Sequence, residues 1–257
     1  MSTVPKLAIS GKTDVGRLRE HNEDSIAWDA KLGLVVLADG MGGHNAGEVA
    51  SELAVNTVLS VLRTALTADE GDANRTELLQ DAVDDANSAI FNQSHEQPQC
   101  AGMGTTLVGA LFSDEGMIWA HVGDSRIYRL RQTELSQITT DHSLLEELVQ
   151  NGYLTKEEAQ LSVNKNLITR ALGIEADVDA DVDIDTLMAD DIYLFCSDGL
   201  SDLVNEQDIA SILNDRSRDL DTAAASLVFA ANAKGGTDNI SVILVHVLPT
   251  EGETHVD

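Results

Sequence analysis

The chain has 257 residues, of which 43% are apolar, 3 are proline and 2 are cysteine. That composition supplies a core for one large or two small domains, leaves little material for a disordered linker and excludes a disulfide framework. Its 44 acidic residues against 16 basic ones give a net charge of −28. Such a charge argues against binding to nucleic acid or to an anionic membrane surface.

The first residues lack the apolar segment of a signal peptide, and no uninterrupted apolar run approaches the length that spans a membrane. With two cysteines, Cys100 and Cys196, the chain fits a reducing compartment. We therefore expect a cytoplasmic protein.

In chain order, groups of hairpin-like strands alternate with amphipathic helices. Capping boxes are expected at Asn45 with Glu48 and at Thr155 with Glu158. No linker or internal repeat appears, so we expect one domain over 1–257, built of antiparallel sheet with helices packed outside. The expected elements are two or three strands over 6–38, helices over about 45–65 and 74–93, a strand meander over 104–138, a polar helical segment over 142–172 that is a candidate flap, a strand over 191–196, helices near 199–214 and 220–234, and a closing strand over 240–247.

The most informative stretch is Asp39-Gly40-Met41-Gly42-Gly43, which closes the apolar run 32–38. The run is typical of a buried strand, and the glycines let the backbone turn sharply beside a ligand. A carboxylate with free backbone carbonyls is a hard-oxygen donor set, which favours Mg²⁺ or Mn²⁺ over zinc. The same arrangement recurs where other apolar runs end, at Asp124 and Asp198, and Asp238 stands just before the last strand.

Other chemistries are excluded by their missing residues. No Walker A motif is present, and no two histidines have the helical spacing of a zincin, so histidines such as His21, His95, His121, His142 and His246 are by default surface or structural residues. Six residues after each cysteine stand Thr106 and Asp202, where a cysteine-based phosphatase needs arginine. The alternating acids of 177–185 lack the glycine and glutamate of an EF-hand loop, and we expect an extended segment with its acidic side in water and no site role.

The segment 13–24 places two arginines among several carboxylates. Alone it is compatible with a solvated loop whose ion pairs contribute little. Beside a metal cluster, an arginine such as Arg19 can hold a phosphoryl group bidentately while cations hold its other oxygens.

Seven short motifs, in this order and spacing, resemble the PP2C (PPM) family of metal-dependent protein serine/threonine phosphatases, in its compact bacterial form. The resemblance runs from about residue 7 to residue 248. The motifs are Asp14-x-Gly-x-x-Arg19-x-x-Asn22-Glu23-Asp24, Asp39-Gly-Met-Gly-Gly, Gly104-Thr-Thr, Val122-Gly-Asp-Ser-Arg126, Asp141-His142-Ser143, Ser197-Asp-Gly-Leu200 and Asp238-Asn239.

The resemblance implies an α+β fold, a four-layer αββα sandwich of two antiparallel sheets flanked by helix pairs. It also implies two or three Mn²⁺ or Mg²⁺ ions at one end of the sandwich. Asp39 would bridge two of them, with the backbone carbonyl of Gly40 on the second. The other implied roles are Asp198 and Asp238 on the first metal, Glu23 near the second through water, Asp124 with Asp198 at a third site, and Arg19 on the substrate phosphate.

The implied reaction is hydrolysis of phosphoserine and phosphothreonine on proteins by a metal-bridging hydroxide, without a covalent phosphoenzyme. The partners would be phosphorylated proteins and a cognate bacterial Ser/Thr kinase, and no apolar stripe demands an oligomer. One departure concerns Met41, which stands where many eukaryotic members carry a histidine general acid. The alternatives are a phosphoprotein-binding pseudophosphatase, which usually lacks metal ligands that are present here, and a hydrolase of small phosphoesters.

Overall fold

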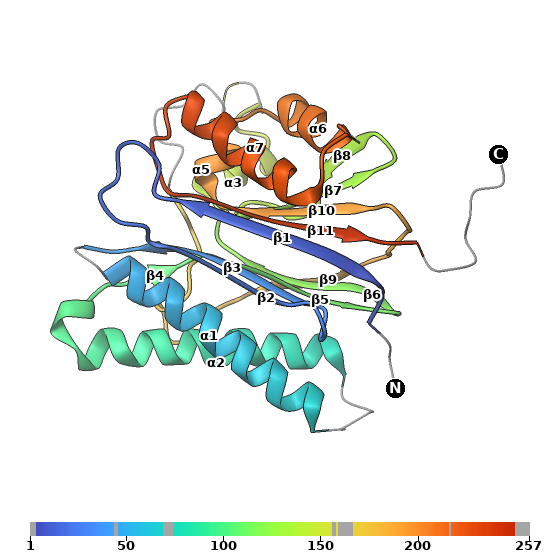
Figure 1. Ribbon diagram of the computed structural model, residues 1–257. Helices are drawn as coiled ribbons and strands as arrows, with labels where there is room; N and C mark the ends of the chain where they lie inside the picture. The colour runs from blue at the N-terminus through green and yellow to red at the C-terminus, as the bar shows by residue number, and fades with distance from the viewer. Residues whose placement is uncertain are drawn as a thin grey trace.

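The structure is a computed structural model that describes residues 4–43, 46–68, 74–155, 158, 167–215 and 217–249. Two antiparallel sheets lie face to face, and helices cover their outer faces (Figure 1). The α+β four-layer αββα sandwich predicted from the sequence is therefore confirmed.

One sheet has the strand order β1-β11-β10-β7-β8. The last strand in the chain, β11, lies inside this sheet, because it pairs with β1 on one side and with β10 on the other. Helices α6 (Glu206–Asn214) and α7 (Leu220–Ala233) cover its outer face, as Figure 1 shows. The strands are β1 (Leu7–Asp14), β11 (Ile240–Val247), β10 (Ile192–Cys196), β7 (Arg126–Arg131) and β8 (Glu134–Gln137).

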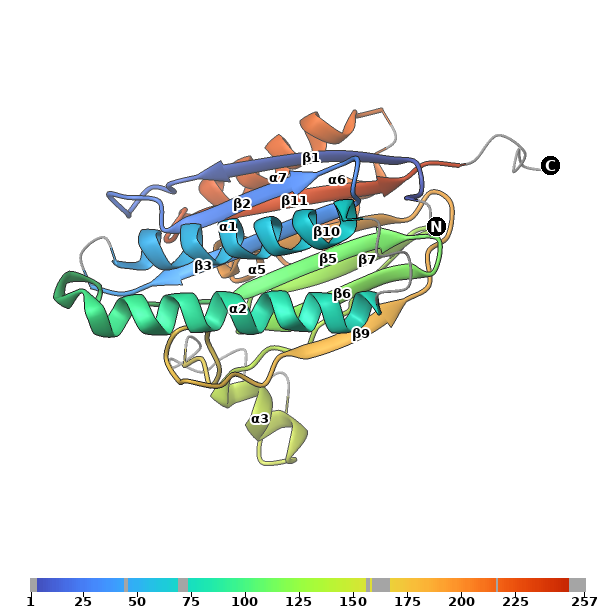
Figure 2. The ribbon, with the colours of Figure 1, turned by 90° about the horizontal axis from the view of Figure 1, so that it is seen from below.

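The other sheet has the order β2-β3-β5-β6-β9, with the short β4 also paired to β3. Helices α1 (Ala46–Thr67) and α2 (Arg75–Glu96) lie across its outer face (Figure 2). A 3₁₀ turn, η1 (Pro98–Cys100), follows α2. The strands are β2 (Asp24–Asp29), β3 (Leu34–Met41), β4 (Gly104–Thr105), β5 (Leu107–Ser113), β6 (Gly116–Val122) and β9 (Asp181–Asp185).

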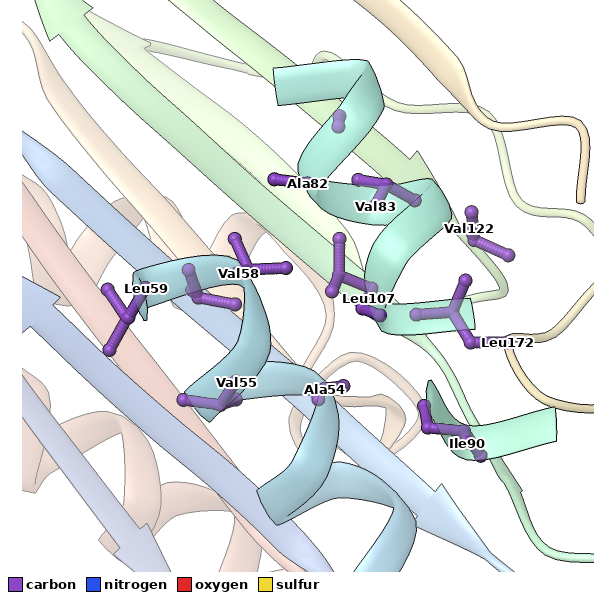
Figure 3. Close-up of a cluster of buried hydrophobic side chains, with 14 of the residues drawn as sticks. Ala54, Val55, Val58, Leu59, Ala82, Val83, Ile90, Leu107, Val122 and Leu172 are labelled. Carbon is purple, nitrogen blue, oxygen red and sulfur yellow. The ribbon is translucent and has the colours of Figure 1, made fainter. Parts of the chain in front are cut away.

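Three buried apolar clusters hold these layers together. One fills the space between the sheets and includes Phe112, Tyr193 and Phe195, whose rings meet edge to face. A second lies under α6 and α7. The third joins α1 and α2 to the second sheet, and Figure 3 shows residues such as Val58 and Val83 directed toward Leu107. The strands of β3, β5 and β6 are buried on both faces because each face meets another layer.

Helix α1 is the one helix among the described residues that is long and apolar enough to cross a membrane, judged by length and composition. Its apolar side chains pack against α2 and the second sheet, and residues such as Ala50, Ala54 and Val58 have no exposed surface. A buried core helix meets the same criterion, so length and composition alone do not identify α1 as a membrane span.

The capping box at Thr155 is confirmed. The Glu158 amide donates to Thr155 Oγ1 at 3.2 Å, and the Thr155 amide donates to Glu158 Oε2 at 2.8 Å. The capping box expected at Asn45 lies outside the described residues. Helix α2 begins at a cap absent from the sequence prediction, Asn74, whose side chain accepts from the Thr76 amide.

The prediction that 142–172 is helical is wrong for much of the part that the structure describes. Helix α3 covers Leu144–Gln150 and Glu158 is also helical, but 167–172 forms no helix. That return passes through isolated bridges, Ser143 with Ile168 and Thr105 with Leu172. The chain is extended there because it pairs with neighbouring backbone, which the helical pattern of the sequence does not reveal.

The acidic segment 177–185 is partly a strand, β9, at the edge of the second sheet. The prediction that its acidic side lies in water is wrong for Asp185. Its carboxylate accepts from Arg129 Nη1 at 2.6 Å and from the Tyr193 hydroxyl at 2.7 Å, both from the opposite sheet. Alternation places the acids on one face of the strand, and at this end that face meets the other sheet.

Candidate metal centre

Asp39 lies near the end of β3, where an apolar strand reaches the rim of the sandwich. In the β2–β3 ladder its direct partner is Asp24, which is 8% exposed. The register therefore places two carboxylates opposite each other on neighbouring strands. Figure 1 shows that the start of α1 and the loop between β1 and β2 lie at this same end of the sandwich.

Gly40 and Gly47 bring the end of β3 against the start of α1. A Cβ at Gly40 would overlap the carbonyl oxygen of Gly47, and a Cβ at Gly47 would lie 2.8 Å from the Glu23 carboxyl carbon. The Gly40 amide also donates to the Glu23 carbonyl at 3.0 Å. Glycine at both positions is thus required for Glu23 and the end of β3 at Asp39 and Gly40 to lie together.

Asp198 and Asp238 are brought together by the turns that precede α5 (Asp198–Ser201) and β11. A Cβ at Gly199 would overlap the carbonyl oxygen of Asn239, so the two turns pack backbone to backbone. The Ser197 hydroxyl donates to Asp24 Oδ2 at 2.8 Å and accepts from the Ser241 amide at 3.0 Å. Ser197 therefore positions Asp24 and does not act as a nucleophile.

The side chain of Asn239 connects three backbone segments. Its Oδ1 accepts from the Glu23 amide at 2.8 Å, and its Nδ2 donates to the carbonyls of Val15 and His21 at 3.0 and 2.9 Å. Asn239 is 4% exposed. It fixes the loop between β1 and β2, which carries Arg19 and Glu23, against the turn that carries Asp238.

Two threonines of the Gly104-Thr-Thr motif hold the backbone of Asp39. The Asp39 amide donates to Thr106 Oγ1 at 3.0 Å, and the Thr105 hydroxyl donates to the Asp39 carbonyl at 2.8 Å. Thr106 Oγ1 also lies 2.7 Å from the Ser125 hydroxyl, next to Asp124. The turn after β6 is thereby connected to the backbone of Asp39.

The carboxylates raise one another's pKa. Burial is the main cause for Asp39, whose pKa lies well above the usual value, followed by the charges of Asp24, Asp198, Asp124 and Asp238. Burial and the same kind of repulsion raise the pKa of Asp198 well above its usual value, and those of Asp24 and Asp124 to about 6. Several buried carboxylates that share one small volume favour the binding of protons or cations.

Two oxygens in this cluster lack a hydrogen-bond partner among the described residues. They are Oδ1 of Asp24 and Oδ1 of Asp198, both buried. Buried polar atoms are normally paired, and an unpaired carboxylate oxygen is costly unless a cation or a water takes the place of the donor. The donor set consists of carboxylate and carbonyl oxygens, so the residues present fit Mg²⁺ or Mn²⁺.

Arg19 lies at the exposed edge of the cluster. Its Nη2 donates to Asp238 Oδ2 at 2.6 Å, and the charges of Glu23 and Asp198 also act on it. The guanidinium is 49% exposed, so it is available to an incoming anion while remaining next to the carboxylates.

The structure brings together the residues that the sequence singled out, because Asp39, Asp198, Asp238 and Asp124 interact electrostatically and Glu23 and Arg19 adjoin them. Sequence reasoning assigned no role to Asp24. The available signal was its position next to Glu23 at the start of β2, opposite the strand that ends in Asp39. His44, three residues after Met41, lies outside the described residues.

Comparison with known proteins agrees with this geometry. The profile of the protein phosphatase 2C family matches residues 17–231. The serine/threonine phosphatase stp of Listeria innocua is 40% identical over 240 residues, which are 91% of this chain and 93% of that protein.

Two solved structures share the fold over nearly the whole chain. The serine/threonine phosphatase Stp1 of Staphylococcus aureus superimposes with a TM-score of 0.88 at 32% identity, over 97% of this chain and 98% of that one. The catalytic domain of the phosphatase PstP, crystallised with two manganese ions, gives a TM-score of 0.84 at 39% identity, over 95% of this chain and 99% of that one.

Proposed function

The chain belongs to the protein phosphatase 2C family, and we propose that it is a metal-dependent protein phosphatase that hydrolyses phosphoserine and phosphothreonine on proteins. The observation that carries the proposal is the group of buried carboxylates around Asp39, whose pKa values are raised by burial and mutual repulsion. Its relatives include named serine/threonine phosphatases, one of them solved with two manganese ions.

We assign the metal ligands by the positions of the carboxylates. Asp39 would serve two ions, and the Gly40 carbonyl, with Glu23 nearby, would serve the second of them. Asp198 and Asp238 would hold the first ion, and Asp124 with Asp198 would provide a third, weaker site. Support comes from the electrostatic repulsion among these carboxylates and from the oxygens of Asp24 and Asp198 that have no partner among the described residues.

When bound, Mg²⁺ or Mn²⁺ supplies Lewis acidity that lowers the pKa of a coordinated water to near neutral. The chain's own residues do the rest of the positioning. Arg19 holds the phosphoryl oxygens bidentately and offsets their charge as the transition state forms. Ser197 and Thr106 fix the carboxylate of Asp24 and the backbone of Asp39. The proposed reaction needs no covalent phosphoenzyme.

A phosphoprotein-binding pseudophosphatase is the alternative from another class. It is disfavoured because Glu23, Asp39, Asp198 and Asp238 are all present and lie together. A hydrolase of small phosphoesters would use the same residues, so only substrate preference separates it from the proposal.

For the cellular setting, the proposal is a monomeric, single-domain enzyme of the cytoplasm that reverses a bacterial Ser/Thr kinase. Asn239 and Ser197 tie residues near both ends of the chain into one site, which supports a single unit. The net charge of −28 supports a soluble location away from anionic surfaces.

The test compares a phosphothreonine peptide with p-nitrophenyl phosphate as substrates, in Mn²⁺ and after EDTA. The proposal predicts metal-dependent hydrolysis with a higher kcat/KM for the peptide. A metal-loaded protein that binds the peptide without releasing phosphate would instead be the binding module. Equal or better hydrolysis of the small ester would favour the small-phosphoester hydrolase.

A further inference from the structure

A second group of ligand-type side chains lies apart from the all-oxygen cluster. His121 on β6, His142 in the turn before α3 and Asp181 at the start of β9 each offer one donor atom, and these atoms lie within 4.8 Å of one another. The sequence gives no hint of this group, because the three residues are separated by 20 or more positions and none forms a zinc-binding helical pair.

His121 is the least explained residue of the group. It has no exposed surface, and neither ring nitrogen makes a well-aligned hydrogen bond to the described residues, although the nearby backbones of Gly123 and Ser125 act on it. Burial lowers its pKa to about 3, with His142 adding to the effect, so the ring is neutral at neutral pH. A buried imidazole without a partner loses its hydration without compensation, which favours a ligand on one of its nitrogens.

The backbone fixes the relative positions of the three residues. His121 and Asp181 are direct partners in the β6–β9 ladder. The His142 amide donates to the Gly123 carbonyl at 2.7 Å, and the His121 and His142 rings lie 4.5 Å apart between centroids. His142 Nε2 is 3.3 Å from Asp181 Oδ2. Three separate segments are therefore held with their donor atoms converging.

We propose that His121, His142 and Asp181 form a second metal site, selective for Zn²⁺ or a similar transition-metal ion. Two imidazoles and one carboxylate, with a fourth position open to water, are a zinc-type donor set. Mg²⁺ prefers oxygen ligands and has little affinity for two imidazoles. The site thus differs in metal preference from the oxygen cluster around Asp39.

Binding at this site has costs that the structure makes visible. Arg170 Nη1 lies 3.4 Å from His142 Nε2 and 3.3 Å from Asp181 Oδ1, so the guanidinium must leave. Arg170 already pairs with Asp179, whose Oδ2 is 3.6 Å away and whose side chain is 90% exposed. The move gives up one partly exposed ion pair and keeps the other, which changes the free energy little.

The proton on the His142 ring must also move from one ring nitrogen to the other. Its Nδ1 accepts from the Gly123 amide at 3.2 Å, a long hydrogen bond. Coordination through Nε2 moves the remaining ring proton to Nδ1 and breaks that bond. The donor atoms must also close to about 3.4 Å from one another, as tetrahedral bonds of about 2.1 Å require. Because of these costs, we expect the site to bind zinc reversibly and more weakly than a site whose ligands already stand at coordination distance.

An ion here would join β6, the segment at His142 and β9, and β6 leads directly to Asp124 of the main site. β6 is followed by Gly123 and Asp124, and His142 follows Asp141. The Thr169 amide donates to the His142 carbonyl at 2.8 Å. Zinc binding would therefore restrain the turn that carries Asp124.

The experiment titrates the full chain with Co²⁺ in excess Mg²⁺ and records the visible spectrum. Tetrahedral Co²⁺ with nitrogen ligands absorbs strongly, whereas octahedral Co²⁺ in an all-oxygen site absorbs weakly, so the two sites are distinguished without an activity assay. The expected result is one equivalent of strongly absorbing Co²⁺ that Zn²⁺ displaces. The variants Asp181→Asn and His121→Asn should weaken this binding at least tenfold.

The matched control is Asp183→Asn, two residues along β9 and exposed, which should bind Co²⁺ as the wild type does. Asp181 is only half-buried, so Asp181→Asn decides the outcome even if His121→Asn fails to fold. A wild type without the strong absorption would overturn the proposal, as would strong absorption that persists unchanged in Asp181→Asn.

Discussion

Asp24 shows how a single carboxylate in the main cluster favours the binding of a proton or a cation. Asp24 is buried, faces Asp39 across the ladder and has one oxygen without a partner among the described residues. Burial raises its pKa from 3.8 to about 6. Without metal, the folded protein therefore binds a proton at Asp24 more tightly than the unfolded chain does.

This shift predicts how the stability of the metal-free protein depends on pH. Since the folded pKa is the higher one, the stabilisation is complete below about pH 4 and is lost as the pH rises through about 6. The loss amounts to about 3 kcal/mol for Asp24, at ~1.4 kcal/mol per pKa unit. In EDTA, Asp24→Asn should unfold at a higher temperature than the wild type at pH 7 and near the same temperature at pH 4.

The control for that prediction is the exposed Asp183→Asn, whose thermal unfolding should follow the wild type at both pH values. If the unfolding temperatures of the wild type and of Asp24→Asn ran parallel from pH 4 to pH 7, protonation of Asp24 would make no contribution to stability.

Thr106 holds the backbone of Asp39, the residue that we propose as the ligand shared by two metal ions. Thr106→Val keeps the shape but removes the oxygen that accepts from the Asp39 amide, which costs about 1–3 kcal/mol. Because such supporting contacts orient metal ligands, Mn²⁺ affinity measured by calorimetry should fall about 10- to 100-fold. Thr64→Val, on the exposed side of α1, should leave it unchanged. Equal affinities in the two variants would refute this role.

At the scale of elements, the end of β3 and the start of α1 must approach through glycine. Gly40→Ala places a methyl group into the Gly47 carbonyl, so we expect a loss of about 3 kcal/mol or more in unfolding free energy. Gly43 has open space around its Cβ position, and Gly43→Ala should cost little. Urea unfolding of the two variants measures the difference; a Gly40→Ala protein as stable as Gly43→Ala would contradict the close approach.

The elements also show what the sequence carries and what it does not. The closing strand Ile240–Val247 and the helix Leu220–Ala233 follow from hydrophobic periodicity alone, because each buries an apolar face. The extended return through Ile168 and Leu172 was missed because its partners, Ser143 and Thr105, lie far away in the chain. A local pattern does not contain pairing of that kind.

The site divides in the same way. Asp39, Asp124, Asp198 and Asp238 stand where apolar runs end or begin, which marks them as residues at the rims of the sheets, and the resemblance to the PP2C family implied their convergence at one end. Asp24 emerges only from the β2–β3 register, and the His121–His142 contact only from the packing of a turn against β6. Both depend on tertiary geometry.

At the scale of the whole molecule, 44 acids against 16 bases create a field that opposes compaction and repels phosphorylated substrates. Salt screens this repulsion. For the metal-free protein at pH 7, raising NaCl from about 0.05 to about 1 M should therefore add about 1–2 kcal/mol of stability, roughly 2–8 °C for a chain of this size. Differential scanning calorimetry measures this; a melting temperature that does not rise would show that repulsion among the acids is already balanced locally.

The measurement that tests the central claim most directly is phosphate release from a phosphothreonine peptide in Mn²⁺ by the wild type, Asp39→Asn and Asp198→Asn, with Asp183→Asn as control. The account predicts turnover that EDTA abolishes, a loss of at least about 100-fold in both site variants and unchanged activity in the control. Site variants that fold, as circular dichroism would show, and turn over the peptide at the wild-type rate would contradict it.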